Sequence, residues 1–341
     1  MEDSCSDDIP PHSRLSAGCT LCFEGAKLVL YITGLCGRSC WYCPLSQQRK
    51  DRDVIYANEH QISSPEEMIV VAHKMSALGT GITGGEPFLV IDRLVEYTSR
   101  LKKEFGKEHQ IHLYSGIPPS YDILTRISGL VDEIRLHPPQ ENWKSIIGSQ
   151  FHESVKNARK MGFDIGFEVP SLPGIEDLVP ILDDLDFLNI NELEWGDTNA
   201  AEMRERGHEL RGDVSNAVQG GKEAVASVLG LAKVHWCSSD FKDRVQLRRR
   251  LLRIAGNTAR EFEEITDDGT VVYGVWECNG QSADMPEDID EELYSRFEDR
   301  IEMAWWLLDD YSAALPGKKS VIERYPDNGL VVEVTPLCSD L

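Results

Sequence analysis

The chain has 341 residues, of which 41% are hydrophobic, so it can form one large α/β domain with an appendage and needs no disulfides to fold. Its net charge of −23 argues against broad electrostatic binding of nucleic acid, and suits either solubility or a high-salt cytoplasm. Six of its nine cysteines precede residue 44, which favours a metal cofactor in a reducing compartment over secreted disulfides.

The first 24 residues form a polar extension. The segment Met1–Asp8 is acidic and lacks the basic and apolar regions of a signal peptide. No run approaches the ~18 apolar residues of a membrane span. We therefore expect a cytoplasmic protein that has no membrane segment.

A buried strand over 28–33 leads into the most informative motif, Cys36, Cys40 and Cys43 at the spacing C-x3-C-x2-C. A [4Fe–4S] cluster normally takes four thiolates, so three thiolates on one loop leave one iron open to a small-molecule ligand. A structural zinc site takes four ligands, usually as two pairs with a longer span between them. The spacing therefore favours a catalytic iron–sulfur cluster over zinc.

A second motif follows one βα unit later. A helix is expected from the capping segment 63–67 to about residue 78, followed by a strand that ends at Gly84, Gly85 and Glu86, with Pro87 after them. The two glycines allow the backbone to approach a ligand closely, and Glu86 supplies acceptors for a cationic amino group.

Four further strand-like runs end near Ser115, His137, Val169 and Trp195, and helical patterns lie at about 90–105, 119–128, 142–161 and 176–187. Strands that alternate with helices at a repeat of about 30 residues indicate a parallel α/β sheet. In barrels of this kind the site lies at the carboxyl ends of the strands, so both motif loops should meet there.

The cysteine motif, with Tyr42 just before its last cysteine, and the Gly-Gly-Glu-Pro motif together resemble the radical S-adenosylmethionine (radical SAM) superfamily. The resemblance covers about residues 25–200. Within the superfamily it is similar to the pyruvate formate-lyase activating enzymes, particularly an uncharacterised archaeal branch. The resemblance implies a partial (β/α)6 TIM-like barrel, here with a small α+β C-terminal extension.

The resemblance also implies the chemistry. Cys36, Cys40 and Cys43 would hold a [4Fe–4S] cluster whose open iron binds S-adenosylmethionine (SAM). Reductive cleavage of SAM would give a 5′-deoxyadenosyl radical that abstracts hydrogen from a substrate. It assigns Gly84, Gly85 and Glu86 to the amino group of SAM. The backbone at Tyr42, and that of residues 172–174, is assigned to the adenine.

Polar residues at the later strand ends are further candidates, because barrel sites are built from such positions. They are Ser115, Arg135, His137, Glu168, Asp197 and Asn199. Each has a plainer interpretation as a loop hydrogen bond or ion pair. No catalytic residue beyond the cofactor-binding set is assigned.

The pair Cys19 and Cys22 has three interpretations: half a zinc site, half an auxiliary cluster, or a redox pair. The residues that would complete a metal site are distant in sequence: His235, Cys237, Cys278 and Cys338. Because the pair precedes the amino end of the first strand by only a few residues, we expect it at the barrel's edge, opposite the mouth. Any metal there would be a second, separate site.

After residue 200 the pattern weakens. We expect a basic helix over 241–255, a hairpin turn at 266–270, a long amphipathic helix over 286–314 and two final strands, near Val321 and over 330–334. The chain is accordingly divided into an N-terminal extension (1–24), a barrel (25–240) and a C-terminal extension (241–341). The cations of residues 242–253 favour pairing with the chain's own carboxylates, with RNA or a phosphorylated substrate as the alternative.

The motifs favour a radical SAM enzyme that resembles a glycyl-radical activase or a modifying enzyme. It would receive electrons from a donor such as a ferredoxin or flavodoxin. Its substrate, whether protein, tRNA or small molecule, is not identified by the sequence. Two alternatives are a non-catalytic iron–sulfur electron carrier and a zinc-stabilised RNA-binding module. The open iron and the Gly-Gly-Glu-Pro motif favour the enzyme.

Overall fold

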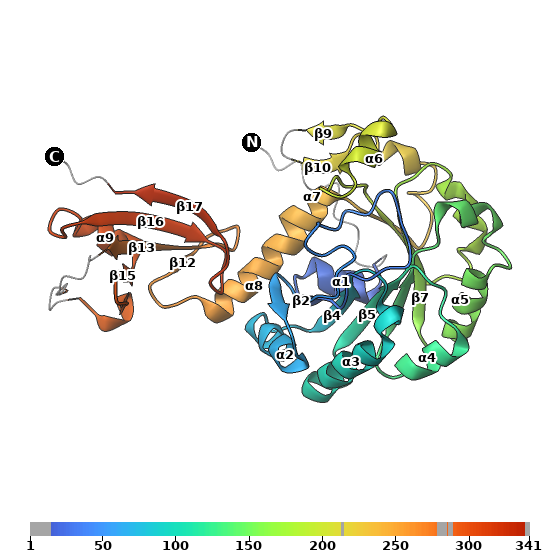
Figure 1. The fold of residues 1–341 in the computed structure, drawn as a ribbon, viewed down its shortest axis with the longest axis horizontal. Helices are drawn as coiled ribbons and strands as arrows, with labels where there is room; N and C mark the ends of the chain where they lie inside the picture. Colours follow the sequence, from blue (N-terminus) through green and yellow to red (C-terminus); the bar gives the residue numbers. More distant parts are fainter. Residues whose placement is uncertain (1–14, 213–214, 278–284, 286–288, 338–341) are drawn as a thin grey trace. The chain divides into compact units, whose positions relative to one another are not determined.

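The computed structural model describes residues 15–212, 215–277, 285 and 289–337 (Figure 1). The chain divides into two compact units. The first comprises residues up to 73 together with 77–246, and the second comprises 74–76 with the residues from 247 onward. None of the described helices combines the length and the apolar character needed to cross a membrane.

The first unit is built on one nine-stranded sheet. Its parallel strands are, in spatial order, β1 (Lys27–Tyr31), β4 (Gly79–Thr83), β5 (Gln110–Ser115), β6 (Glu133–Leu136), β7 (Asp164–Pro170), β8 (Phe187–Asn191) and β11 (Val234–Cys237). Two short antiparallel strands, β2 (Ile55–Ala57) and β3 (His60–Ile62), continue the sheet beyond β1. Since β11 and β3 form its two edges, the sheet is a partial barrel, as predicted, with β11 as an additional parallel strand.

Helices cover the outer face of this sheet: α2 (Pro65–Lys74), α3 (Ile91–Phe105), α4 (Tyr121–Ile127) and α5 (Gln150–Lys160) (Figure 1). Serine side chains cap two of them, because Ser120 accepts from the backbone N–H of Ile123 and Ser149 from that of His152. These caps fix where each crossover starts after its strand.

Two predicted helices are shorter than expected. The helix expected over 142–161 is a 3-10 turn (η4, Gln140–Ser145) followed by α5, because Gly148 takes a left-handed conformation with φ of 80° between them. The helix expected over 176–187 is a 3-10 helix, η5 (Ile175–Ile181), with Pro180 inside it. Proline removes a backbone donor and prevents a regular α-helix there.

The strands alternate between an apolar outer face and a polar inner face. In β5, Ile111 and Leu113 are fully buried, whereas His112 and Tyr114 line the cavity inside the sheet. A closed TIM barrel usually fills its interior with branched apolar side chains. The polar interior of this sheet therefore indicates a binding chamber.

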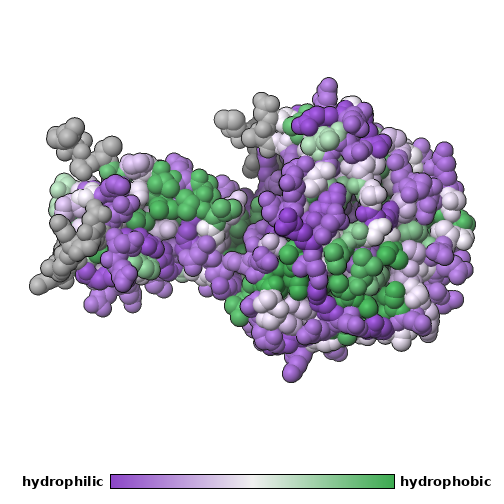
Figure 2. Space-filling model, viewed as in Figure 1, coloured by the Kyte–Doolittle hydropathy of each residue, from purple (hydrophilic) through white to green (hydrophobic). Residues whose placement is uncertain are grey.

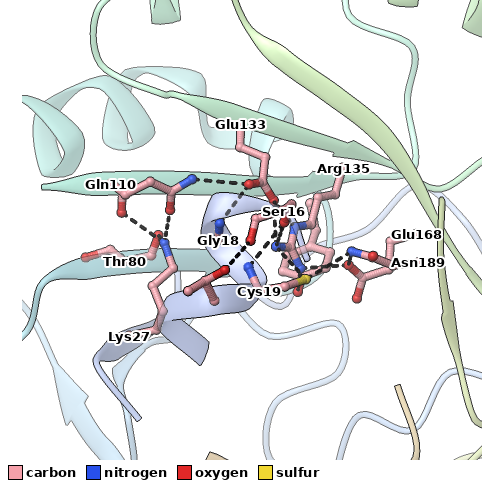
Figure 3. Close-up of polar contacts among 12 residues, drawn as sticks. Ser16, Gly18, Cys19, Lys27, Thr80, Gln110, Glu133, Arg135, Glu168 and Asn189 are labelled. Atoms are coloured by element: carbon pink, nitrogen blue, oxygen red, sulfur yellow. Dashed lines mark hydrogen bonds and ion pairs between the residues drawn. The ribbon is translucent and has the colours of Figure 1, made fainter. Parts of the chain in front are cut away.

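The described part of the N-terminal extension, residues 15–24, packs inside the sheet. Helix α1 (Ala17–Phe23) starts at Ser16, whose side chain accepts from the N–H of Cys19, and its Gly18 N–H donates to Glu133 of β6 (2.9 Å). A Cβ atom at Gly18 would lie only 2.5 Å from Nδ1 of His112. Glycine at this position thus lets α1 pack against β5 and β6 (Figure 3).

A connection of α6 (Ala200–Glu205) and a hairpin of β9 (Leu210–Gly212) and β10 (Ser215–Val218) follows β8. After β11 the chain forms the short helix α7 (Ser239–Phe241) and a π-helical segment (Lys242–Leu247), which complete the first unit through Gln246. Lys242 forms an ion pair with Glu194 at 2.8 Å.

The second unit contains helix α8 (Arg248–Thr258) and an antiparallel sheet. The sheet order is β14 (Tyr294–Arg296), β15 (Arg300–Met303), β13 (Val271–Glu277), β16 (Lys318–Arg324) and β17 (Val331–Pro336), with β12 (Glu264–Ile265) also paired to β13. Its core includes Trp276, Met303 and Leu308. Arg248 pairs with Asp268, so at least this cation of the basic helix is matched by a carboxylate.

The prediction of a single helix over 286–314 is wrong. Its described residues form a 3-10 turn (η8, Glu291–Leu293), the strands β14 and β15, and the short helix α9 (Trp305–Asp310). Met303 is fully buried and pairs with Gly274 of β13, so sheet pairing outweighs the local helical pattern. The two final strands are present as β16 and β17.

The edge strand β17 exposes apolar side chains. Val331, Val332 and Val334 are each more than half exposed, as is the adjacent Leu330. Figure 2 shows hydrophobic residues gathered on the surface of the second unit. An apolar edge strand of this kind is suited to pairing with another strand.

Candidate functional site

A cavity of about 510 Å³ lies inside the first unit and reaches the carboxyl ends of the parallel strands. The predicted cluster ligands and the predicted cofactor-binding residues line it, except for the turn at residues 172–174. They are Cys36, Cys40, Tyr42, Cys43, Gly84, Gly85, Glu86, Ser115, His137 and Glu168. The structure thus brings together residues from five strand ends, while their roles as ligands remain predictions.

The two motif loops bind each other through their backbones. The N–H of Gly85 donates to the carbonyl of Thr33 and the N–H of Glu86 to that of Leu35, both at 2.7 Å. A Cβ atom at Gly85 would lie 2.1 Å from the Leu35 carbonyl oxygen, and Gly84 has φ of 139°. The glycines are therefore required for contact with the cysteine loop itself, whether or not they also approach a ligand.

Glu86 connects the second motif to the next strand. Its carboxylate accepts from the N–H of Phe88 (3.1 Å), the hydroxyl of Ser115 (2.9 Å) and the N–H of Gly116 (2.8 Å). Burial raises the pKa of Glu86, and these donors partly oppose the effect. Two carboxylate oxygens offer about four acceptor sites, so one remains for a donor in the cavity.

Tyr42 is fixed by His137 at the end of β6. The two side chains are 2.8 Å apart (Oη to Nε2), and Nδ1 of His137 lies 2.8 Å from the carbonyl oxygen of Glu168. Because that carbonyl can only accept, Nδ1 carries the proton. Burial lowers the pKa of His137, so the ring is neutral and Nε2 accepts from the Tyr42 hydroxyl. This orients the loop residue that precedes Cys43.

Arg38, inside the cysteine motif, anchors the loop to the opposite strand ends. Its guanidinium donates to the carbonyls of Gly116 (2.8 Å) and His137 (2.9 Å). No periodic pattern in the sequence marks this residue. Its position between two predicted ligands, and its several donors, could have suggested a backbone anchor.

A buried ionic network occupies the inner part of the cavity (Figure 3). Arg135 donates to Glu133 (2.6 Å) and Glu168 (2.8 Å), and all three side chains are at least nine-tenths buried. Burial raises the pKa of Glu168, but Arg135 and the amides of Asn191 and Asn189 outweigh it, so the net shift is downward. Arg135 and Glu168 are therefore charged and paired.

The amides of Asn189 and Asn191 belong to this network and were missed from the sequence. Both donate to the Glu168 carboxylate, at 3.1 Å and 2.7 Å, and the Oδ1 atom of Asn189 has no hydrogen-bond partner among the described residues. Their spacing of two in an otherwise apolar strand places both on its inner face, which was the available signal.

The expectation that Cys19 and Cys22 lie at the barrel's edge, outside the site, is wrong. Both line the same cavity as the cysteine motif, because Gly18 packs α1 against the side chains of His112, Glu133 and Arg135 inside the sheet. Sγ of Cys19 accepts from Arg135 and Asn189, each at 3.4 Å (Figure 3). His235 and Cys237 of β11 line the cavity too, whereas Cys278 and Cys338 lie outside the described residues.

These inner thiols are in their protonated form at neutral pH. Burial raises the pKa of Cys19, that of Cys22 to about 11 and that of Cys237 to about 12, with Arg135 or Lys242 opposing the effect. Among residues 15–337, as far as they are described, no three His, Cys, Asp or Glu side chains are grouped to hold a metal ion. A second metal at Cys19 and Cys22 therefore remains a prediction.

The donor set of the cysteine loop fits an iron–sulfur cluster better than a single ion. The thiols of Cys36, Cys40 and Cys43 line one cavity, and a multi-iron cluster binds each thiolate at a different iron. Backbone N–H groups of Arg38 and Leu45 donate to the sulfurs of Cys36 and Cys43. Such N–H···S bonds stabilise cluster-bound thiolates.

The other sequence candidates are Asp197, Asn199, the turn at residues 172–174 and Arg135. The first three do not line this cavity. Asp197 and Asn199 contact the cysteine loop from the segment that follows β8. Of the turn after β7, Pro170 lines the cavity and residues 172–174 do not. Arg135 lines it, although its guanidinium is committed to the ionic network.

Comparisons with known proteins agree with this site. Residues 23–158 match the family described as a 4Fe-4S single cluster domain, and residues 269–337 match a domain of unknown function, DUF8061. A Methanocaldococcus jannaschii protein named "Putative glycyl-radical enzyme activating enzyme MJ0021" is 39% identical over 276 residues, which cover 77% of this chain and 73% of the relative.

Crystal structures of Streptococcus suis SuiB were also found. The SAM-bound form has a TM-score of 0.42 and 13% identity over 62% of this chain, and the form bound to the precursor peptide SuiA has a TM-score of 0.40 and 11% identity over 73%. The chain spans about half the length of SuiB.

The identity to the archaeal relative extends over about three quarters of each chain. The protein is an enzyme with a [4Fe–4S] cluster as a cofactor. It belongs to the radical SAM superfamily, in the family of this glycyl-radical activating-enzyme relative.

Proposed function

We propose that this protein activates a partner polypeptide by abstracting a hydrogen atom from one of its glycine residues. Bound cluster and SAM supply the 5′-deoxyadenosyl radical for this step. The observation that carries the proposal is the single cavity in which the three motif thiols face Gly84, Gly85 and Glu86, in a chain of the activating-enzyme family.

The residues have distinct tasks in this proposal. Cys36, Cys40 and Cys43 hold the cluster, and the free acceptor site of Glu86 receives the amino group of SAM. Tyr42, oriented by His137, presents its backbone to the adenine. An electron donor such as a ferredoxin or flavodoxin supplies the reducing electron.

The inner chamber supports a polar substrate. It is lined by Arg135, Glu168 and Asn189, in which the two charges are paired and one amide oxygen is unpartnered. A neutral group with N–H donors matches this chamber better than an ion, because a further charge would stay uncompensated there. The peptide backbone around a glycine has this chemistry.

The test uses proteins labelled with α-dideuterated glycine, extracted from cells that contain this chain. The reduced, SAM-loaded enzyme should transfer deuterium into 5′-deoxyadenosine when it meets the labelled protein fraction. The small-molecule fraction of the same cells is the control. Deuterium transfer from that fraction alone would contradict a protein glycine as the substrate.

A further inference from the structure

One segment of the first unit contacts the cysteine loop at several positions between Trp41 and Gln47. The segment follows β8 and comprises residues 196–208; its contacts run from Trp41 to Gln47, about 155 residues earlier. We call residues 196–199, with Arg206 and His208, the loop clamp.

The clamp binds the backbone carbonyls of Tyr42, Cys43 and Leu45. Nδ2 of Asn199 donates to the carbonyl of Tyr42 (3.1 Å). The hydroxyl of Thr198 lies 3.1 Å from the carbonyl oxygen of Cys43 and 2.5 Å from that of Leu45. The Tyr42 carbonyl thus has its own donor on the clamp, and the carbonyls of Cys43 and Leu45 share the one hydroxyl proton of Thr198, which restrains the backbone on both sides of Cys43.

Asn199 is itself held in place. Its Oδ1 accepts from the N–H of Gly196 (2.8 Å), and its Nδ2 also donates to the carbonyl of Glu194 (2.9 Å). The residue is 1% exposed, so each of these bonds is shielded from water. A buried amide with all these partners has one orientation, and that orientation points a donor at Tyr42.

The side chain of Trp41, between Cys40 and Cys43, is held by the same segment. Its ring stacks on His208 with centroids 5.4 Å apart and planes 9° apart, and the guanidinium carbon of Arg206 lies 4.4 Å from the ring centroid. Glycine at position 196 is needed for the approach, because a Cβ there would lie 2.8 Å from the carbonyl oxygen of Pro44.

We propose that Thr198 and Asn199 are positioning residues for the iron–sulfur cluster. They hold the backbone of residues 42–45 in the conformation that turns the thiols of Cys40 and Cys43 into the cavity, before the cluster binds. This inference rests on the proposed cluster ligands. It predicts that a variant with a weakened clamp releases iron faster than the wild type, while the stability of its apoprotein changes little.

The experiment replaces Thr198 by Val, which keeps the shape and removes the hydroxyl donor. After anaerobic reconstitution, iron release to a chelator is followed by absorbance, the reduced cluster by EPR, and unfolding of the apoprotein by circular dichroism. Iron release from Thr198→Val should be on the order of tenfold faster, since one hydrogen bond to the ligand segment is lost. Thr198→Ser, which restores the donor, should return it close to the wild-type rate.

The matched control is Thr125→Val. Thr125 also donates its hydroxyl to a backbone carbonyl, that of Tyr121 (2.9 Å), but on the exposed helix α4. Its iron release and EPR signal should be those of the wild type. A second variant, Gly196→Ala, should displace Pro44 and accelerate iron release while every clamp donor is kept.

Equal iron release and identical EPR signals for wild type, Thr198→Val and Gly196→Ala would overturn the inference while leaving the cluster assignment intact. An acceleration as large in Thr125→Val would also overturn it, because the effect would then not belong to the clamp. If the wild type itself bound no cluster, the proposed ligands would fail, and this inference with them.

Discussion

At the residue scale, the residues predicted to bind a ligand also make hydrogen bonds and close contacts with one another. Glu86 illustrates this: its carboxylate joins the second motif to Ser115 and Gly116 and keeps one acceptor site free. Gly85 likewise allows the second motif to contact the carbonyl of Leu35. Both residues were predicted from a motif, whereas these contacts come from the fold.

Replacing Glu86 by Ala should weaken SAM binding by at least about tenfold, since a charge-assisted hydrogen bond is worth roughly 1.5–3 kcal/mol. The cluster should remain, because the backbone N–H of Glu86 still donates to Leu35. SAM titration of the anaerobic protein, followed by the perturbation of the cluster's EPR signal, measures this. Unchanged affinity would show that Glu86 does not meet the ligand.

Replacing Gly85 by Ala should displace the cysteine loop, because the new Cβ would meet a backbone oxygen at 2.1 Å. Iron content after reconstitution should fall clearly below that of the wild type. Gly37→Ala, in the same loop, is the control, since a Cβ there meets nothing within 4 Å. Equal iron content in the two variants would contradict the close approach of the two loops.

At the scale of elements, α1 is the unexpected part of the structure. A helix of seven residues, Ala17–Phe23, brings Cys19 and Cys22 into the cavity and meets the Arg135 network. The network in turn connects β6, β7 and β8 through Glu133, Glu168 and Asn189. The inner end of the chamber is therefore held together by hydrogen bonds and ion pairs among α1 and three strands.

The double variant Cys19→Ala/Cys22→Ala should keep the primary cluster and SAM cleavage, because the ligands of the motif loop are untouched. Loss of the buried Cys19 side chain should lower the free energy of unfolding by roughly 1–3 kcal/mol. Iron and zinc analysis together with denaturant unfolding measures both effects. A second metal, if bound by this pair, should be lost in the variant. Loss of the primary cluster from a folded variant would refute the independence of the two cysteine sets.

Replacing Arg135 by Met should destabilise the protein by about 3–5 kcal/mol, because it leaves buried carboxylates without their partner. The control is Arg126→Met, whose ion pair with Asp92 is exposed and should change stability by about 1 kcal/mol or less. Urea unfolding compares the two variants. Equal stability losses would mean that the inner network is not a structural core.

At the scale of the whole molecule, two parts of the structure could be predicted from the sequence: the repeated strand–helix units and the two motif loops. The alternation of strands and helices predicts the sheet. The rule that sites lie at strand ends predicts that Cys36, Glu86 and Glu168 share one site, and the three residues line one cavity.

The features that could not be predicted depend on contacts between distant segments. The short helix α1 has no periodic signal, and only its packing on His112 and Glu133 places it inside the barrel. Strand β15 was predicted as helix because the pairing of Met303 with Gly274 is invisible locally. The contacts of Thr198 with the cysteine loop join residues about 155 positions apart.

The central claim is that Cys36, Cys40 and Cys43 hold the cluster that cleaves SAM in this cavity. The most direct measurement is the formation of 5′-deoxyadenosine from SAM by the reduced, anaerobic protein, compared with Cys40→Ala. The wild type should form 5′-deoxyadenosine and methionine, and Cys40→Ala should lose the cluster and the product. A Cys40→Ala protein that retained a full cluster and formed 5′-deoxyadenosine at the wild-type rate would contradict the claim.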